Sequence, residues 1–504
     1  MRILEKLELL RKQGGKIRTP GLPDEVIARF AATSPQLNLA VDEAVIRQRA
    51  LLEEYPDLMD LDETAQIDTI LQSFVNFYAD DAVNPYIALA ARGPWIITSR
   101  GAVVHDSGGY GMLGLGHGPE SILRAMSGNQ VMANIMTPSF SHLRLASALR
   151  REIGHARKDG CPYSQFLCLN SGSESVTCAA RLSDVNAREM TEPEGRHAGK
   201  EIVGLALRGG FHGRTERPAQ FSHSTQRAYA RHLASFRDLD NLLVVEPNNI
   251  AQLEAAFQTA DKENLFIESL FLEPVMGEGN PGYAMQPEFY RRARELTLEH
   301  GSLLLVDSIQ AGLRAHGVLS IVDYPGFEDC AAPDMETYSK ALNAGQYPLS
   351  VLAVTERAAA LYRKGIYGNT MTANPRALDV AVAVLDALTD ELRTNIRERG
   401  VEFLTKFGEL QKELGGRITG AQGTGLLLSC ELDPTYKCFG ANSTEEYMRF
   451  NGIGVVHGGV NSLRFTPHFA VTSEEIDLIV AMTRDALLNG PRQQADEEPH
   501  RAAS

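Results

Sequence analysis

Apolar runs alternate with helical patterns between about residues 120 and 355. The helical segments have apolar residues every three or four positions. The apolar runs between them are FLCLN (166–170), IVGLAL (202–207), LLVVE (242–246), SLFLEPV (269–275), SLLLVDS (302–308) and PLSVLAVT (348–355). Runs of this kind are typical of strands buried on both faces, and the helices between them provide the crossovers that parallel strands need. The pattern therefore predicts an α/β domain with a mainly parallel sheet covered by helices.

The flanking segments have different patterns. Helical spacing predicts helices at 42–53 and 65–78, and 95–106 is expected to form a short hairpin before the glycine-rich stretch SGGYGMLGLGHGPES. After residue 356 we expect two long helices (372–399 and 399–414), strands at LLLSCEL, GIGVVHG and SLRFTPH, and a closing helix at 473–488. These patterns predict four segments: an N-terminal helical extension and hairpin (1–105), a large domain (106–355), a small α+β domain (356–489) and a disordered tail (490–504).

The composition excludes several classes of protein. The 504 residues carry a formal net charge of −15, which argues against a nucleic-acid partner or an acidic membrane surface. No apolar run approaches the roughly 18 residues of a membrane span, and the N-terminus has no apolar stretch of secretory length. The six cysteines form no C-x-x-C motif, so we expect reduced thiols in a cytoplasmic protein and no metal site.

Two charged residues stand where strand-like runs end. Asp307 closes the run 303–306, and Lys340 follows a second short extended run at 336–339. Ligands of α/β sheets bind at the carboxyl ends of strands, so both side chains are expected to point into one crevice. An amine and a buried carboxylate are what pyridoxal 5'-phosphate (PLP) requires, as Schiff-base lysine and as partner of the pyridinium nitrogen. Taken singly, Asp307 is equally compatible with a helix N-cap, and Lys340 with a solvated surface lysine.

Other candidate residues also follow apolar runs. Ser171, Gly172 and Ser173 open a helical pattern, where N–H groups and hydroxyls form either an anion site or an ordinary N-cap cluster. Phe211 could stack on a planar heterocycle or simply pack a loop. The segment 109–114 spells G-x-G-x-x-G, but no apolar strand leads into it, which disfavours a dinucleotide site.

In this order and spacing, these residues resemble the class III (ornithine/ω-amino acid type) aminotransferases of PLP fold type I. The similarity covers roughly residues 95 to 485. It implies a large domain with a mainly parallel seven-stranded sheet flanked by helices, and a smaller α+β C-terminal domain. It also implies a transaminase that moves an amino group from an amine or ω-amino acid to a 2-oxo acid or aldehyde by a ping-pong mechanism. A PLP-dependent aminomutase or racemase on the same scaffold is the alternative, and a catalytically silent protein is a third interpretation.

The resemblance assigns roles around the cofactor phosphate. It implies that Gly172 and Ser173 bind the phosphate, beside Ser171 of the same segment. Phe211 matches the stacking aromatic residue of the F/Y-H-G motif, which here continues with His212. Thr370 matches a threonine that reaches the phosphate from the neighbouring subunit, which implies a homodimer with composite active sites.

The resemblance also assigns roles around the ring and the substrate. Asp307 matches the pyridinium partner, and Lys340 matches the Schiff-base lysine that serves as general base and acid. Ile309 and Gln310 match the contacts to the ring face and to the phenolic oxygen. The remaining two matches form a pair that would receive a substrate carboxylate: Glu278 in EPVMGEGN and Arg464 in SLRFTPH.

Four positions in two segments depart from the family pattern. The usual D-E-x-Q-T-G is D-S-I-Q-A-G here, so Ser308 lacks a carboxylate and Ala311 lacks a hydroxyl. The usual P-P-L after the arginine is Pro467-His468-Phe469. None of these changes removes a residue that the resemblance assigns to catalysis.

Overall fold

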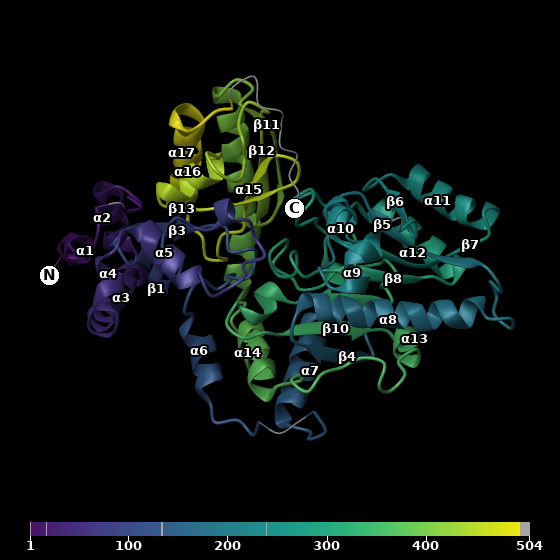
Figure 1. The fold of residues 1–504 in the computed structure, drawn as a ribbon. Helices are drawn as coiled ribbons and strands as arrows, with labels where there is room; N and C mark the ends of the chain where they lie inside the picture. The colour runs from purple at the N-terminus through teal and green to yellow at the C-terminus, as the bar shows by residue number, and fades with distance from the viewer. Residues whose placement is uncertain (1, 17, 133–134, 238, 494–504) are drawn as a thin grey trace. The chain divides into compact units, whose positions relative to one another are not determined.

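The computed structural model describes residues 2–16, 18–132, 135–237 and 239–493 (Figure 1). The chain divides into two compact units, each of which is described by itself. Unit 1 comprises the described residues within 1–120, 399–422 and 428–500, and unit 2 those within 121–398 and 423–427. The domain boundaries expected at 105, 355 and 489 stay predictions. Residues 494–504 of the expected disordered tail lie outside the described residues.

A seven-stranded sheet forms the centre of unit 2. Its strands pair side by side in the following order: β4 (Gln165–Leu169), β10 (Ser350–Val354), β9 (Met335–Tyr338), β8 (Leu303–Asp307), β7 (Leu265–Leu272), β5 (Glu201–Leu207) and β6 (Leu242–Val245). Strands β9, β8, β7, β5 and β6 are parallel, whereas β10 runs antiparallel to both β4 and β9. The expectation of a mainly parallel sheet built from the apolar runs is therefore confirmed.

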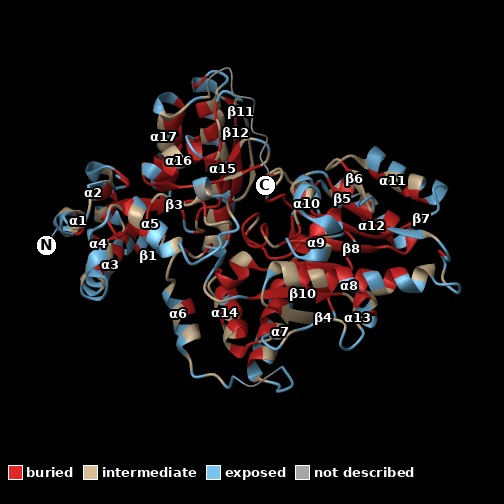
Figure 2. Cartoon of the chain, viewed as in Figure 1, coloured by how far each residue is buried: buried red, intermediate tan, exposed pale blue. Residues whose placement is uncertain are grey.

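Helices cover this sheet and bury its apolar side chains (Figure 2). The helices of unit 2 are α6 (Glu120–Ser127), α7 (Phe140–Glu152), α8 (Gly172–Thr191), α9 (Glu216–Phe221), α10 (Gln226–His232), α11 (Ile250–Lys262), α12 (Pro287–His300), α13 (Glu356–Ala360), α14 (Pro375–Asp386) and the first turns of α15 (Asp390–Glu413). Helix α8 packs the small residues Ala179 and Ala180 against Leu305 and Leu352 of the sheet in one buried cluster. Small side chains let the helix approach the sheet closely, which fixes where its N-terminus lies.

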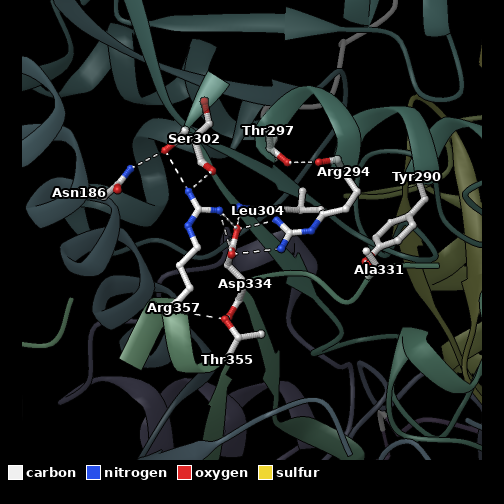
Figure 3. A network of polar contacts seen from close by, with 12 residues as sticks. Asn186, Tyr290, Arg294, Thr297, Ser302, Leu304, Ala331, Asp334, Thr355 and Arg357 are labelled. Carbon is white, nitrogen blue, oxygen red and sulfur yellow. Dashed lines mark hydrogen bonds and ion pairs between the residues drawn. The ribbon is translucent and has the colours of Figure 1, made fainter. Parts of the chain in front are cut away.

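A buried ionic network fixes the amino ends of β8 and β9 (Figure 3). Asp334, fully buried directly before β9, accepts hydrogen bonds from Arg294 at 2.7 and 3.2 Å and from Arg357 at 3.2 and 3.4 Å. It also accepts the backbone N–H of Leu304 on β8 at 2.9 Å. Because both oxygens are paired several times, the buried charge is compensated. The network joins the two strands at the ends opposite their carboxyl termini.

Unit 1 contains two four-stranded sheets and most of the remaining helices. The first sheet consists of β1 (Ala88–Arg92), β2 (Trp95–Thr98), β3 (Val103–Asp106) and β13 (Ile453–Gly454), and the second of β11 (Ile418–Thr424), β12 (Leu427–Leu432), β15 (Ser462–Phe465) and β14 (Val456–Gly458). The helices are α1 (Ile3–Arg11), α2 (Asp24–Thr33), α3 (Pro35–Glu54), α4 (Pro56–Asp60), α5 (Glu63–Leu71), the rest of α15, α16 (Thr444–Phe450) and α17 (Ser473–Asn489). Across both units, none of the described helices is long and apolar enough to span a bilayer.

Four elements differ from the sequence prediction. The strand expected at GIGVVHG is split into β13, which pairs with β3, and β14, which pairs with β15. The helix expected at 65–78 ends at Leu71, before a stretch of exposed aromatic and β-branched residues that favour helix weakly. The break expected at 399 is absent, because α15 is continuous, and the chain turns instead at 387–389. There Thr389 Oγ1 accepts the N–H of Leu392 at 3.3 Å, as an N-cap does. Strand β11 was not expected, because its sequence ITGAQGT has few apolar residues.

Candidate active site

Nine of the predicted cofactor residues line one cavity in unit 2. The cavity measures about 170 Å³ and lies where β8 and β9 end. Its lining comprises Ser171, Gly172, Ser173, Phe211, His212, Gly213, Glu273, Asp307, Ile309, Gln310, Ser339 and Lys340. The crevice expected at the carboxyl ends of the strands is therefore present, and Asp307 and Lys340 both reach it.

Asp307 is buried at the end of β8 and has two hydrogen-bond donors. His212 Nδ1 donates to its Oδ2 at 3.0 Å, and the backbone N–H of Ile309 donates to its Oδ1 at 3.2 Å. The alternative of a helix N-cap is wrong, because the described residues 308–320 form turns rather than a helix. A carboxylate held by two donors while facing a cavity is oriented toward a ligand.

Lys340 follows β9 in an unusual backbone conformation. Its φ is +48°, a left-handed value that costs a non-glycine residue about 1 kcal/mol or more. The preceding Ser339 is anchored by a hydrogen bond from its hydroxyl to the carbonyl of Leu349 at 2.7 Å. Two residues earlier, on β9, Thr337 shares a short hydroxyl hydrogen bond with Ser175 of α8. These bonds hold the half-buried lysine at the rim of the cavity, which rules out the alternative of a solvated surface lysine.

The N-terminus of α8 forms the opposite wall. Ser171 caps the helix by accepting the N–H of Glu174 at 3.3 Å, so the N-cap interpretation is correct, and the same turn lines the cavity. A Cβ on Gly172 would lie 2.6 Å from Ile309 Cδ1, so a side chain at this position would displace Ile309. The free amides and the dipole of the first turn make this wall suitable for a phosphate.

The loop after β5 brings Phe211 against the same turn. Gly213 has φ of +115°, and a Cβ there would lie 2.4 Å from Ser173 Oγ, so only glycine fits. Ser173 Oγ accepts the N–H of Arg214 at 3.3 Å, while Phe211 donates its N–H to Glu273 Oε1 at 3.0 Å. The aromatic ring is thus fixed at the cavity wall from both sides of the loop.

Glu273 is a cavity residue that the sequence interpretation missed. Its pKa is raised to about 7, mainly by burial and also by the nearby Asp307, against the opposing effect of His212. Its second oxygen accepts the N–H of Gly277 at 2.8 Å. Glu273 follows the end of β7, so the rule that selected Asp307, a carboxylate at the carboxyl end of a strand, would have selected it as well.

Three predicted site residues are not among those that line the cavity. Glu278 is half-buried five residues after Glu273, and Thr370 is exposed in the loop before α14. The neighbouring Asn369 links this loop to the turn that opens α8, by bonds to Asn170 at 3.0 Å and to Glu174 at 2.8 Å. Arg464 belongs to unit 1, where it is fully buried on β15 with its guanidinium carbon 5.3 Å from the ring centre of Tyr110.

The departure at Ser308 has a structural counterpart on the adjacent strand. Ser308 Oγ donates to Oε1 of the fully buried Glu336 on β9 at 2.6 Å. Tyr163 donates its hydroxyl to Glu336 at 2.6 Å, and Ile321 its backbone N–H at 2.9 Å. The carboxylate that Ser308 lacks is therefore supplied from β9, directly behind Asp307.

Comparison with known proteins agrees with this geometry. The family model of aminotransferase class-III matches residues 77–487. The chain belongs to the class-III aminotransferases. It is 29% identical to ornithine aminotransferase 2 of Staphylococcus aureus over 405 residues, which is 79% of this chain and 93% of that protein.

Solved aminotransferase structures share the fold of this class-III aminotransferase. Ornithine aminotransferase from Toxoplasma gondii superposes with a TM-score of 0.72 at 22% identity, covering 87% of this chain and 98% of that one. N-acetylornithine aminotransferase from Stenotrophomonas maltophilia superposes with a TM-score of 0.64 at 22% identity, covering 84% and 98%. The fold is PLP fold type I, as expected.

The enzyme is a PLP-dependent transaminase. The cavity of unit 2 fits this cofactor, because it offers an amine, a buried carboxylate and a helix N-terminus within one enclosed space. The alternative of an aminomutase or racemase receives no support from the family or from these relatives.

Proposed function

We propose that this aminotransferase holds its cofactor in the cavity of unit 2, with Lys340 as the residue that binds the aldehyde. The observation that carries the proposal is the convergence of Lys340, Asp307 and the α8 N-terminus on one cavity of about 170 Å³. The phosphate would bind at Gly172 and Ser173, where backbone amides and the helix dipole favour an anion.

The residues of the chain divide the catalytic work. When bound, PLP supplies an aldehyde that accepts an amino group and a ring that withdraws electrons. With PLP in place, the Lys340 amine would remove a proton from the amine-bearing carbon of the substrate as general base and return a proton as general acid. Asp307 would hold its negative charge at the ring nitrogen, and the hydrogen bond from His212 keeps that carboxylate in position. Phe211 and Ile309 would cover the ring and exclude water.

We propose an ω-amino acid as amino donor and a 2-oxo acid as acceptor. The support comes from the relatives, which are named ornithine and N-acetylornithine aminotransferases, and from the matches at Glu278 and Arg464. Arg464 would bind a substrate carboxylate through two parallel hydrogen bonds. A panel of diamines, ω-amino acids and α-amino acids, scored by bleaching of the bound cofactor, distinguishes these donors. Preference for a simple amine without a carboxylate would overturn this assignment.

The role of Lys340 is tested by trapping. Borohydride reduction of the holoenzyme should attach the cofactor covalently to the peptide that contains Lys340, as read by mass spectrometry. Lys340→Ala should lose both this adduct and turnover, whereas Lys364→Ala, at an exposed lysine in the same unit, should retain both. An adduct on another lysine of the wild-type enzyme would refute the assignment.

We further propose that two chains form a homodimer with composite sites. Exposed apolar side chains cluster near the loop of Thr370, and patches of this kind mark interaction surfaces. Their exposed fractions are 76% for Val131, 80% for Met136, 77% for Phe140, 64% for Leu143 and 58% for Met371. A small cavity lined by Val131, Ile135, Ala373 and Pro375 joins the two segments.

Mixing variants tests the dimer. Lys340→Ala and Thr370→Ala should each be impaired alone, since one lacks the amine and the other the phosphate contact. Mixed dimers place both defects in one site and leave the second intact, so activity should return to roughly a quarter of the wild-type value. A monomer in light scattering, or no recovery on mixing, would contradict the proposal.

A further inference from the structure

Three potential metal ligands meet in unit 1, on elements far apart in the sequence. His105 lies on β3, His468 follows β15, and Glu475 is in the first turn of α17. One ligand atom from each lies within 4.8 Å of the others. His468 stands in the Pro467-His468-Phe469 segment, where the family pattern has P-P-L. The histidine is therefore a property of this chain and has no place in the proposed transamination site.

The distances in this cluster are longer than hydrogen bonds between charged groups. His468 Nε2 lies 3.2 Å from Glu475 Oε2 and 3.4 Å from Oε1, and His105 Nε2 lies 3.6 Å from Oε1. Charge-assisted N–H···O bonds are typically about 2.7–2.9 Å. With Zn²⁺ bonds of about 2.0–2.1 Å, two ligands of a tetrahedron are about 3.4 Å apart. The two distances to Oε1 are close to such an edge, and all three ligand atoms lie within 4.8 Å of one another.

The ring nitrogens of His105 are not satisfied by hydrogen bonds within the described residues. Its side chain is fully buried, and neither ring nitrogen has a hydrogen-bond partner among the described residues. The edge-to-face contact with Trp95, at 5.1 Å between ring centres, is an apolar contact that satisfies neither nitrogen. A buried imidazole of this kind loses free energy unless a ligand binds it.

Glu475 is oriented from behind. Its Oε2 accepts the backbone N–H of Thr472 at 2.7 Å in the capping box of α17, while its Oε1 lies 3.4 Å from His468 Nε2 and 3.6 Å from His105 Nε2. Hydrogen bonds that orient a ligand in this way are typical of protein metal sites.

We propose that His105, His468 and Glu475 bind one Zn²⁺ ion, with a water at the fourth position. Two imidazoles and a carboxylate form a donor set that zinc accepts in proteins. The ion fastens β3 to α17 and to the loop after β15, and so stabilises the strand that leads into the glycine-rich stretch. This site goes beyond the transaminase activity and differs from the expectation of no metal site.

The test measures metal content and melting temperature of the full-length holoenzyme. After incubation with ZnCl₂ and dialysis, wild type should retain about one zinc per chain, and a chelator should lower its melting temperature by roughly 5 °C. Co²⁺ in place of zinc should give the visible bands of a tetrahedral ion.

Variants separate a metal site from a hydrogen-bonded cluster. His468→Gln can still donate a hydrogen bond to Glu475, but it should retain no zinc and should melt at the same temperature with and without chelator. The matched control is His457→Gln, which removes a histidine whose Nδ1 lies 2.9 Å from Glu445, at normal hydrogen-bond distance; it should bind zinc as wild type does. If His468→Gln does not fold, His105→Gln replaces it in the same comparison.

Equal zinc content in wild type and His468→Gln would overturn the proposal. A wild-type melting temperature indifferent to both zinc and chelator would overturn it equally. Neither result depends on transaminase activity, so failure here leaves the proposed function untouched.

Discussion

Asp334 is expected to contribute more to the stability of unit 2 than any exposed ion pair. Asp334→Ala leaves Arg294 buried without its carboxylate, and removing one partner of such a pair costs about 3–5 kcal/mol. The N–H of Leu304 loses its acceptor as well, while the half-buried Arg357 keeps its bonds to the carbonyls of Gly301 and Ser302. We therefore expect a loss of about 4 kcal/mol, dominated by Arg294.

Hydrogen exchange read at peptide level is the suitable assay, because a chain of two units need not unfold in one step. A loss of about 4 kcal/mol should reduce the protection of the β8 amides roughly 10³-fold. Arg363→Ala is the control, since its ion pair with Glu189 is half-exposed and contributes about 0–1 kcal/mol. Protection in Asp334→Ala within tenfold of that in Arg363→Ala would refute the reasoning.

Three further outcomes follow from the structure. Ser308→Glu places a second carboxylate beside Glu336 and should lower the free energy of unfolding by about 3 kcal/mol. Adding Glu336→Ser should restore the melting temperature. A double variant that melts no higher than Ser308→Glu contradicts this. Gly213→Ala should raise the dissociation constant for PLP at least about tenfold, measured by fluorescence titration, while Gly199→Ala, at φ of +75° with open space around it, should leave that constant unchanged. Burial raises the pKa of Glu268 from 4.5 to about 7, so its contribution to stability is complete below pH 4.5 and is lost as the pH rises through 7. Between these two pH values the melting temperature of Glu268→Gln should therefore fall less than that of the wild type. An equal fall in both proteins argues against the raised pKa.

Much of the α/β unit could be predicted from the sequence, because its strands are buried on both faces and appear as uninterrupted apolar runs. The run ending at Asp307 and the one before Lys340 could be placed in one sheet by the same rule, and both residues line the cavity. Strand β11 could not be recognised, because its glycine and polar residues leave no regular alternation of apolar and polar positions.

The contacts that complete the site depend on tertiary structure. The bond between Ser308 and Glu336 joins two strands whose register the sequence does not specify. His105 lies more than 350 positions before His468 and Glu475, so no local spacing in the sequence predicts that these three residues form a cluster. Glu273 is different, because it directly follows an apolar run, as Asp307 does, and its position at the carboxyl end of a strand can be read from the sequence.

The network around Asp334 has a consequence for how this enzyme can change. The residues that secure β8 and β9 lie at one end of the strands, and those that line the cavity lie at the other. Substitutions in the residues that line the cavity can therefore accumulate while the bonds that hold the sheet stay intact. Directed evolution of substrate range should proceed furthest in variants that leave Asp334 and its two arginines unchanged.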